Sequence, residues 1–370
     1  MINSIEPAID PNNRIDFLID WELTLKCNLD CSYCKNSPDM DGGHWTLANH
    51  PNKQGCIDTI DFLYKYTDLY MQTKQRFSRC AVLNVYGGES LLHPDIVEIL
   101  AATRDKHTNY DWPLTITTTT NAIIGTRRMQ EIIPYIDEFT ASYHTDSLPK
   151  QKQQFRENVL EIAKNNKRVK VIVMMTDDYS KWDELLELID WCKQNNIKYL
   201  AKQLDNAHPS KLYNLEQLAW FAQEYNESMD FTEDTQLAKQ GRSCCGGRSL
   251  CTNSNLQDRK NWIPRVNFQG WSCSVNHFFV FVKQNDGRIF VNKDCRMNYN
   301  GKVEPIGNID NAEILLAETK DRLSGPDIPL MTCAKTRCVC GICAPKASTL
   351  DIAKQIMKKH TVSSQWWTLQ

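Results

Sequence analysis

The 370-residue chain has no excess of charge of one sign, no apolar run of membrane-spanning length and no signal-like N-terminus. Its formal net charge of −2 gives no global field that would attract polyanions, so a nucleic-acid partner is not implied. A membrane helix needs about 20 consecutive apolar residues, and the polar segment 1–13 lacks the apolar centre of a secretion signal. We therefore expect a soluble, cytoplasmic protein that does not enter the membrane.

Cysteine, in contrast, is abundant, with 15 residues in the chain. Disulfide-rich scaffolds are usually small secreted domains, and this chain is neither small nor signal-bearing. In a reducing cytosol the thiols more plausibly bind metal, and an odd number agrees with three-thiolate sites and unpaired core residues. Cys56, Cys80 and Cys192 fall within helix or strand patterns and are predicted to be core residues.

Between residues 17 and 205 short apolar strands alternate with amphipathic helices, which predicts parallel βα units. The predicted strands are 17–25, 80–86, 114–120, 138–143, 168–175 and 197–203. The predicted helices are roughly 54–75, 94–106, 127–136, 150–166, 180–195 and 214–228. Six units are too few for an eight-stranded barrel. The sequence therefore predicts an α/β fold with an open (β/α)6 partial barrel, whose active site lies at the carboxyl ends of the strands.

Three thiols, Cys27, Cys31 and Cys34, follow the first predicted strand directly. An iron–sulfur cube needs four ligands, normally cysteine thiolates, so a cube held by these three keeps one iron open for a substrate or cofactor. Two alternatives remain at this point. One is a zinc knuckle, for which His44 is the only local fourth ligand, and the other is a chance cluster in a cysteine-rich chain.

The second predicted strand ends in Gly87-Gly88-Glu89. Glycines at a strand end let the backbone approach a ligand closely, and a neighbouring carboxylate can bind an ammonium group through a charge-assisted hydrogen bond. Alone, however, Gly-Gly-Glu is also a common turn sequence.

The pattern Cys-x3-Cys-x2-Cys, with Tyr33 before its last cysteine, resembles the signature of the radical S-adenosylmethionine (radical SAM) superfamily. The resemblance implies that Cys27, Cys31 and Cys34 hold a [4Fe–4S] cluster whose open iron binds SAM. One electron, from a donor such as flavodoxin or ferredoxin, cleaves SAM to a 5'-deoxyadenosyl radical that abstracts a hydrogen atom from the substrate. Gly87, Gly88 and Glu89 match the family motif that binds the amino group of SAM.

The resemblance also implies weaker SAM contacts at the ends of other strands. Asn121 lies in Thr-Asn-Ala, where the family often has Thr-Asn-Gly, and Ser142 stands where a family serine often contacts the ribose or carboxylate. Tyr33 and Met174 would lie near the adenine. For Asn121 and Ser142 the alternative is a solvated or helix-capping side chain, and for Met174 it is core packing.

A second cysteine cluster begins where Cys273 and Cys295 flank two apolar runs joined by 285–287, Asn-Asp-Gly, which is a strong hairpin signal. The hairpin would bring the two thiols together at its open end. With Cys340 and Cys343 they can form a closed four-thiolate site, for zinc or for an iron–sulfur cluster.

This hairpin, the following 306–309 and the Cys-x2-Cys end resemble the SPASM/Twitch extension of radical SAM enzymes, which carries one or two auxiliary iron–sulfur clusters. The spacing Cys-x4-Cys-x-Cys-x2-Cys departs from the usual SPASM pattern, so a single cluster is the first hypothesis. A second cluster would take ligands from Cys333, Cys338, Cys244, Cys245 and Cys251.

These observations predict an N-terminal extension at 1–13, a radical SAM core at 14–205, a helical linker at 206–240, an auxiliary-cluster domain at 241–349 and a tail at 350–370. The expected function is that of a radical SAM oxidoreductase or maturase, which modifies a ribosomally made peptide or protein by oxidation, epimerisation, or carbon–carbon or thioether bond formation. We expect no leader-peptide-binding domain before the core, which keeps a small metabolite such as a sugar, nucleoside or amino acid as the alternative substrate. A non-catalytic zinc-binding interaction module is the more distant alternative.

Overall fold

The computed structural model describes residues 16–31, 34, 49–73, 80–203, 213–228, 268–292, 295–325, 329–335 and 346–354. Six parallel strands form the centre: β1 (Asp16–Thr24), β2 (Cys80–Gly87), β3 (Leu114–Thr120), β4 (Glu138–Tyr143), β5 (Arg168–Met175) and β6 (Lys198–Gln203). The helices that follow them in turn are α1 (Lys53–Gln72), α2 (Ile96–His107), α3 (Thr126–Ile132), α4 (Pro149–Lys164), α5 (Trp182–Gln194) and α6 (Leu215–Ser228). The fold is α/β, and the six predicted strands and helices are confirmed.

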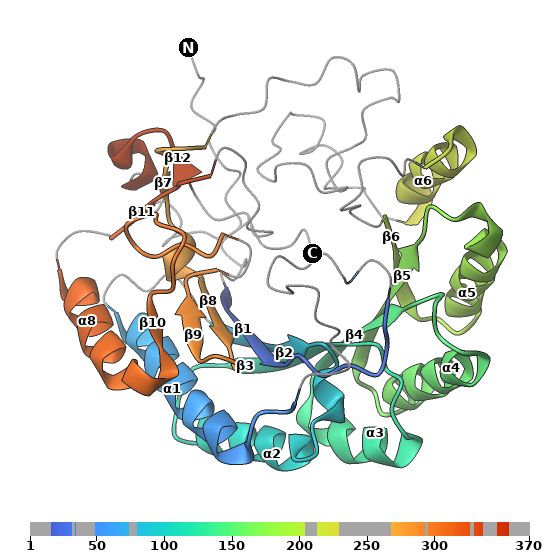
Figure 1. Cartoon of the computed structure of the whole chain (residues 1–370), viewed down its shortest axis with the longest axis horizontal. Helices are drawn as coiled ribbons and strands as arrows, with labels where there is room; N and C mark the ends of the chain where they lie inside the picture. Colours follow the sequence, from blue (N-terminus) through green and yellow to red (C-terminus); the bar gives the residue numbers. More distant parts are fainter. Residues whose placement is uncertain are drawn as a thin grey trace.

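The helices cover the outer face of a curved, open sheet, which is the arrangement of a partial barrel (Figure 1). The alternation along β1 shows how the sequence specifies this. Phe17, Ile19, Trp21 and Leu23 are buried in the core beneath the helices, whereas the polar Asp20 belongs to the opposite set of side chains. Because successive side chains of a strand point to opposite faces, the hydrophobic set fixes which face the helices cover.

The third helix is shorter than predicted. It ends at Ile132, and a 3-10 helix at 133–135 follows, with Pro134 in its first turn. Proline has no backbone N–H to continue the α-helical hydrogen bonds, so the predicted range 127–136 is divided at this residue.

The hairpin expected after residue 273 is confirmed as β8 (Phe279–Lys283) and β9 (Arg288–Phe290). It does not form a sheet of its own, however. β8 pairs with β1 in parallel, and β10 (Gly307–Asn308) follows at the edge, so that one sheet has the order β10-β9-β8-β1-β2-β3-β4-β5-β6. The hairpin thereby supplies hydrogen-bond partners to the side of β1 that β2 leaves open, which is the usual need of an edge strand. The predicted domain limits themselves stay predictions.

Beyond the hairpin, α8 (Ala312–Ser324) packs against α1, so the C-terminal part also contacts the core through helices (Figure 1). A small antiparallel sheet joins β7 (Ser272–Cys273) to β11 (Met331–Thr332) on one side and β12 (Lys346–Ala347) on the other. Among the described residues no helix has the length and apolar character required to cross a membrane.

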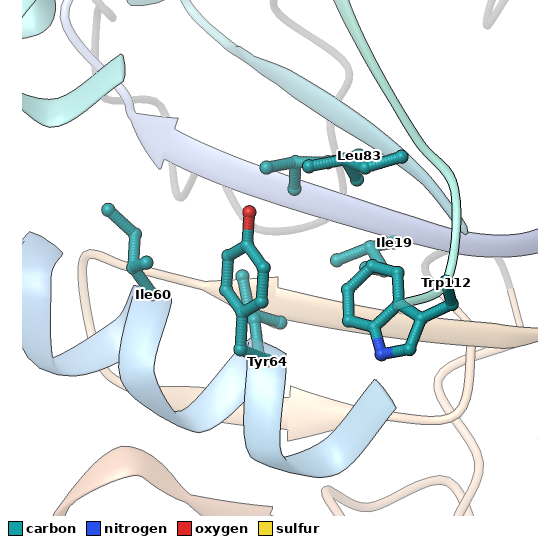
Figure 2. A pocket seen from close by; sticks show the side chains of 7 residues that line it. Ile19, Ile60, Tyr64, Leu83 and Trp112 are labelled. Carbon is teal, nitrogen blue, oxygen red and sulfur yellow. The ribbon is translucent and has the colours of Figure 1, made fainter. Parts of the chain in front are cut away.

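A small cavity lies inside the core, between α1 and the first three strands (Figure 2). Its volume is about 10 Å³, which is roughly the space of one water molecule. Its lining is apolar, and the Tyr64 hydroxyl beside it already donates a hydrogen bond to the carbonyl of Thr103 at 2.6 Å. The cavity is therefore a packing defect of the core and does not form part of the candidate site.

Candidate functional site

The candidate site lies where β1, β2 and β3 end. These strands are parallel neighbours, so their carboxyl ends meet at one edge of the sheet. Cys27 comes three residues after β1, Gly88 and Glu89 come directly after β2, and Asn121 comes directly after β3. The fold therefore brings together residues that are spread over about a hundred positions of the sequence.

The two glycines pack against the chain that leads into Cys27. A Cβ atom on Gly87 would lie 2.0 Å from the carbonyl oxygen of Thr24, and one on Gly88 would lie 2.5 Å from the carbonyl oxygens of Leu25 and Lys26. The backbone N–H of Gly88 donates to the Thr24 oxygen at 2.8 Å. The close approach predicted for these glycines is thus an approach to the backbone of this loop, and their contact with a ligand stays a prediction.

Glu89 is completely buried, and its carboxylate joins the ends of two strands. Oε1 accepts hydrogen bonds from the Leu91 N–H at 3.1 Å and the Thr120 hydroxyl at 2.8 Å, and Oε2 accepts one from the Asn121 N–H at 2.6 Å. Burial raises the pKa of Glu89 to about 7, although the hydrogen bonds from Asn121, Thr120 and Leu91 oppose the rise. The backbone N–H of Glu89 in turn donates to the Lys26 carbonyl at 2.7 Å.

Asn121 is a buried support for the cysteine loop. Its Nδ2 donates to Oδ1 of Asn28 at 2.7 Å and lies 3.8 Å from the Cys27 sulfur, within sulfur hydrogen-bond range. Asn28 in turn donates to the carbonyl of Ile123 at 2.7 Å. The next residue, Ala122, has a φ of 54°, a left-handed conformation that glycine adopts more easily. This backbone explains why a Thr-Asn-Gly sequence suits this turn.

The three motif cysteines differ in exposure: Cys31 is buried, Cys27 is half-buried and Cys34 is exposed. Burial raises the pKa of the Cys27 thiol to about 11, against the lowering effect of the hydrogen bond from the Leu29 N–H, and the charge of Glu89 adds to the rise. A hydrogen bond with the side chain of Cys31 lowers the pKa of Cys34 and outweighs the opposing effect of partial desolvation. A thiolate at Cys27 therefore requires a nearby positive charge.

No three His, Cys, Asp or Glu side chains are grouped so as to hold a metal ion as they stand, in the part of the chain that the structure describes. The donors around Cys27 nevertheless suit a thiolate ligand. The Leu29 N–H is 3.4 Å from its sulfur and the Asn121 amide is 3.8 Å away, and such N–H groups stabilise the sulfurs of iron–sulfur sites.

Ser142 and Met174 are half-buried on β4 and β5. Their neighbours Ala141, Tyr143, Val173 and Met175 lie in the core under the helices, so both side chains belong to the opposite, inner face of the sheet. No contact among the described residues joins either side chain to the cysteine loop. Tyr33 lies outside the described residues.

Sequence reasoning missed two supporting residues, Asn28 and Thr120. Asn28 lies between two motif cysteines and Thr120 ends a run of four threonines, so their positions in the sequence were the only signal that pointed to them. Their partners, Asn121 and Glu89, become evident only when the strand ends meet.

The distal cysteines Cys273, Cys295 and Cys333 lie in one buried cluster. Cys273 is on β7, opposite Met331 of β11 and Lys346 of β12. The segment between these two strands carries Cys338, Cys340 and Cys343, so it leaves and rejoins the small sheet beside Cys273. These three cysteines, like Cys244, Cys245 and Cys251, lie outside the described residues. Cys56, Cys80 and Cys192 are buried, as predicted for core residues.

No family model and no curated protein matches the sequence. Among solved structures, the chain is similar to one titled "Native anSMEcpe with bound AdoMet", with 13% identity and a TM-score of 0.47 over 83% of this chain and 82% of that chain. A second structure, of a histidine-tagged form of anSMEcpe with bound AdoMet, has 14% identity and a TM-score of 0.47 over 83% of this chain and 81% of that chain.

Proposed function

We propose that the chain is a radical SAM enzyme with an auxiliary iron–sulfur site. The observation that carries the proposal is the 2.7 Å hydrogen bond from the Glu89 N–H to the Lys26 carbonyl, one residue before Cys27. It places the Gly-Gly-Glu sequence directly against the start of the three-cysteine sequence. Two short motifs that are far apart in the chain thus lie side by side, at the sheet edge where such folds place their chemistry, and this proximity supports the proposal.

In this proposal Cys27, Cys31 and Cys34 hold a [4Fe–4S] cluster. The N–H donors of Leu29 and Asn121 near the Cys27 sulfur fit a thiolate that ligates iron. Together with SAM, the cluster would supply a 5'-deoxyadenosyl radical that abstracts a hydrogen atom from the substrate.

Glu89 would bind the ammonium group of SAM. Oε1 already accepts two hydrogen bonds and Oε2 accepts one, so one lone pair of Oε2 is left for a further donor. A neighbouring ammonium group would also favour the ionised carboxylate over the neutral acid that burial favours. Gly87 and Gly88 would act by fixing this backbone beside the loop, and Asn121 by holding the loop. Ser142, Met174 and Tyr33 remain the proposed contacts to the rest of SAM.

The auxiliary site would use Cys273 and Cys295 together with Cys340 and Cys343. The common burial of Cys273, Cys295 and Cys333 supports adding Cys333 to the candidate ligands. A second auxiliary cluster would draw on Cys338, Cys244, Cys245 and Cys251. Such a cluster would accept or relay an electron or position the substrate, while flavodoxin or ferredoxin would supply the electron that starts each cycle.

A ribosomally made peptide or protein is the proposed substrate. The pattern of the distal cysteines resembles that of the SPASM/Twitch extension, and such substrates are common among enzymes with this extension. A small metabolite such as a sugar, nucleoside or amino acid is the second candidate. Its supporting observation is the inner face of the sheet, where polar side chains such as Thr119 and Ser142 are at least partly exposed.

The test is anaerobic purification, followed by counts of iron and acid-labile sulfide and an assay for 5'-deoxyadenosine after reduction in the presence of SAM. We expect iron and sulfide in equal amounts, and 5'-deoxyadenosine that disappears when Cys27, Cys31 and Cys34 are replaced by Ala. The matched control is Cys192→Ala, since Cys192 is a buried core thiol on α5. Zinc without labile sulfide would instead identify a zinc-binding module and exclude the radical mechanism.

A further inference from the structure

A group of buried polar atoms without hydrogen-bond partners lies where the C-terminal part packs on α1. Within the described residues these atoms include the hydroxyls of Thr67 on α1 and Thr319 on α8, Oδ1 of Asn276, and both Nε and Nη1 of Arg322 on α8. Thr67 and Thr319 are fully buried, and Asn276 is 1% exposed. Buried polar atoms almost always have a partner, so several unsatisfied ones in one region indicate a missing ligand or water.

The guanidinium of Arg322 is the charged member of this region, and aromatic side chains surround it. Its Nη2 donates to the Tyr70 hydroxyl at 2.5 Å. Its central carbon lies 3.7 Å from the centre of the Tyr299 ring, a close cation–π contact. The hydroxyl groups of Tyr299 and Tyr66 form a hydrogen bond of 2.8 Å. The tyrosines thus fix the plane of the guanidinium while two of its three nitrogens stay without a partner in the described residues.

The described neighbours do not neutralise this cation. Burial raises the pKa values of Tyr66 and Tyr70 well above their usual range, so both phenols are uncharged at neutral pH. Burial, followed by the charge of Arg322, lowers the pKa of His277 to about 3, so this imidazole is neutral as well. Arginine stays protonated in proteins. Arg322 as a residue is half-buried, but its Nε and Nη1 atoms are buried, and a partly desolvated cation with neutral surroundings is stabilised when an anion accompanies it.

Thr67 and Thr319 each lie about one helical turn from the residue of their own helix that forms the Arg322–Tyr70 hydrogen bond. Thr67 precedes Tyr70 by three residues on α1, and Thr319 precedes Arg322 by three residues on α8, so each pair shares a helix face. These two helices pack against each other. Hydroxyl groups without a partner therefore lie on the faces of both helices that carry Tyr70 and Arg322.

We propose that Arg322 holds a small monovalent anion, of the size of a halide or a carboxylate group, between α1 and α8. The guanidinium N–H groups that Tyr70 leaves unused donate to the anion, and the hydroxyls of Thr67 and Thr319 add neutral donors. A water molecule would satisfy the hydrogen bonds but would leave the charge uncompensated, which is why the geometry and the charge together favour an anion. This site is independent of the proposed radical chemistry.

The first test measures the thermal unfolding of the full-length, anaerobically prepared protein at constant ionic strength, while chloride replaces the bulky sulfonate HEPES. A ligand that binds only the folded state should raise Tm by about 2 °C for each tenfold increase of chloride above its dissociation constant. Acetate should act in the same way if a carboxylate fits the site. A wild-type Tm that depends on neither anion would count against the proposal.

The variant Arg322→Gln should lower Tm and abolish its dependence on chloride. The matched control is Arg104→Gln, because Arg104 is a half-buried arginine that already has a carboxylate partner, Asp137, at 2.7 Å. This control should also lower Tm but should keep the full chloride dependence. Equal loss of the dependence in both variants would mean that the effect is a general salt effect.

A structural measurement decides the point if Arg322→Gln does not fold. Wild-type crystals grown or soaked in bromide should show an anomalous peak within hydrogen-bond distance of the Arg322 guanidinium. A carboxylate of the chain itself in that position, or water alone, would overturn the proposal.

Discussion

The side-chain amide of Asn121 donates a hydrogen bond to Oδ1 of Asn28, 2.7 Å away, and so connects the end of β3 to the loop that carries the motif cysteines. The same amide lies within hydrogen-bond range of the Cys27 sulfur. A loop rich in potential metal ligands is thus positioned by the rigid sheet rather than by its own sequence. This arrangement suits a catalytic centre, because supporting hydrogen bonds orient the ligands.

The Asn28–Asn121 pair should be coupled energetically. Asn28→Ala and Asn121→Ala should each destabilise the protein, and the double variant should lose less than the sum of the two, with an interaction energy of about 1 kcal/mol. Iron loss to a chelator should be faster in all three variants. Asn165→Ala provides a control, since Asn165 is an exposed helix-end residue. Strictly additive effects with an unchanged rate of iron loss would show that the pair does not support the loop.

The two glycines of the second strand end should not tolerate a methyl group. A Cβ on Gly87 or Gly88 would overlap backbone carbonyls of 24–26, which cannot rotate away as a side chain would, so Gly87→Ala and Gly88→Ala should destabilise the protein by at least about 2 kcal/mol. Both variants should also retain less iron, because the displaced segment leads into Cys27. Urea denaturation and iron analysis test this.

Gly55→Ala is the matched control for these variants. Gly55 lies in the first turn of α1, where an added Cβ meets side-chain atoms no closer than 3.4 Å. Alanine favours the helix, so the substitution should leave stability unchanged or raise it by up to about 1 kcal/mol. A similar loss in all three alanine variants would contradict the steric explanation.

Glu89 should make the protein less stable as pH rises from about 5 to 7. The folded-state pKa of about 7 lies above the ordinary value of 4.5, so the native state binds the proton more tightly than the unfolded state within this window. The free energy of unfolding should therefore fall by about 3 kcal/mol between pH 4.5 and pH 7 through this group alone. Urea denaturation at pH 5 and pH 8 should show this difference in the wild type.

Glu89→Gln removes the titration and serves as the comparison. The variant should carry a constant penalty, because an amide N–H₂ would face donors that now bond to a carboxylate oxygen, and it should lack the wild-type slope between pH 5 and pH 8. Identical pH dependence in the two proteins would show that Glu89 is ionised throughout this range.

The distal cysteines should hold metal independently of the motif loop. Cys273→Ala and Cys295→Ala should each lower the iron content by about four atoms per chain if their site holds a cube, and the production of 5'-deoxyadenosine should persist. Cys56→Ala should keep all of the iron, since Cys56 is a fully buried thiol of α1. Unchanged iron in the Cys273 and Cys295 variants would mean that these residues are core thiols only.

The sequence predicted the six βα units well because each is a local pattern. Strand β5, for example, is an apolar, β-branched run, and the helix after it repeats its apolar residues at helical spacing. The partial barrel and the edge at which the cysteines lie followed from counting these units. The glycines were recognised for their ability to allow close approach, although what they approach was not predictable.

The pairing of β8 with β1 was not predictable from such patterns. It is a parallel contact between segments that are far apart in the chain, and neither strand's alternation specifies a partner. The hairpin itself was predicted correctly, whereas its place beside β1 was not predicted. The partners of Asn28, Thr120 and Arg322 were hidden for the same reason, because each is a tertiary contact without a sequence spacing of its own.

The position of β1 between β2 and β8 also bears on when the candidate site can form. Trp21 on β1 donates a hydrogen bond to Gln284, 263 residues later, so the first strand emerges from the ribosome long before its second neighbour exists. Contacts of such sequence separation slow folding, since a long loop must close before they contribute. During most of synthesis, the cysteine loop therefore follows a strand that can pair with β2 on one side but has no partner on the other. If this loop binds a metal as proposed, we expect the metal to enter only after β8 has been synthesised, which makes a loop near the start of the sequence a late-maturing part of the protein.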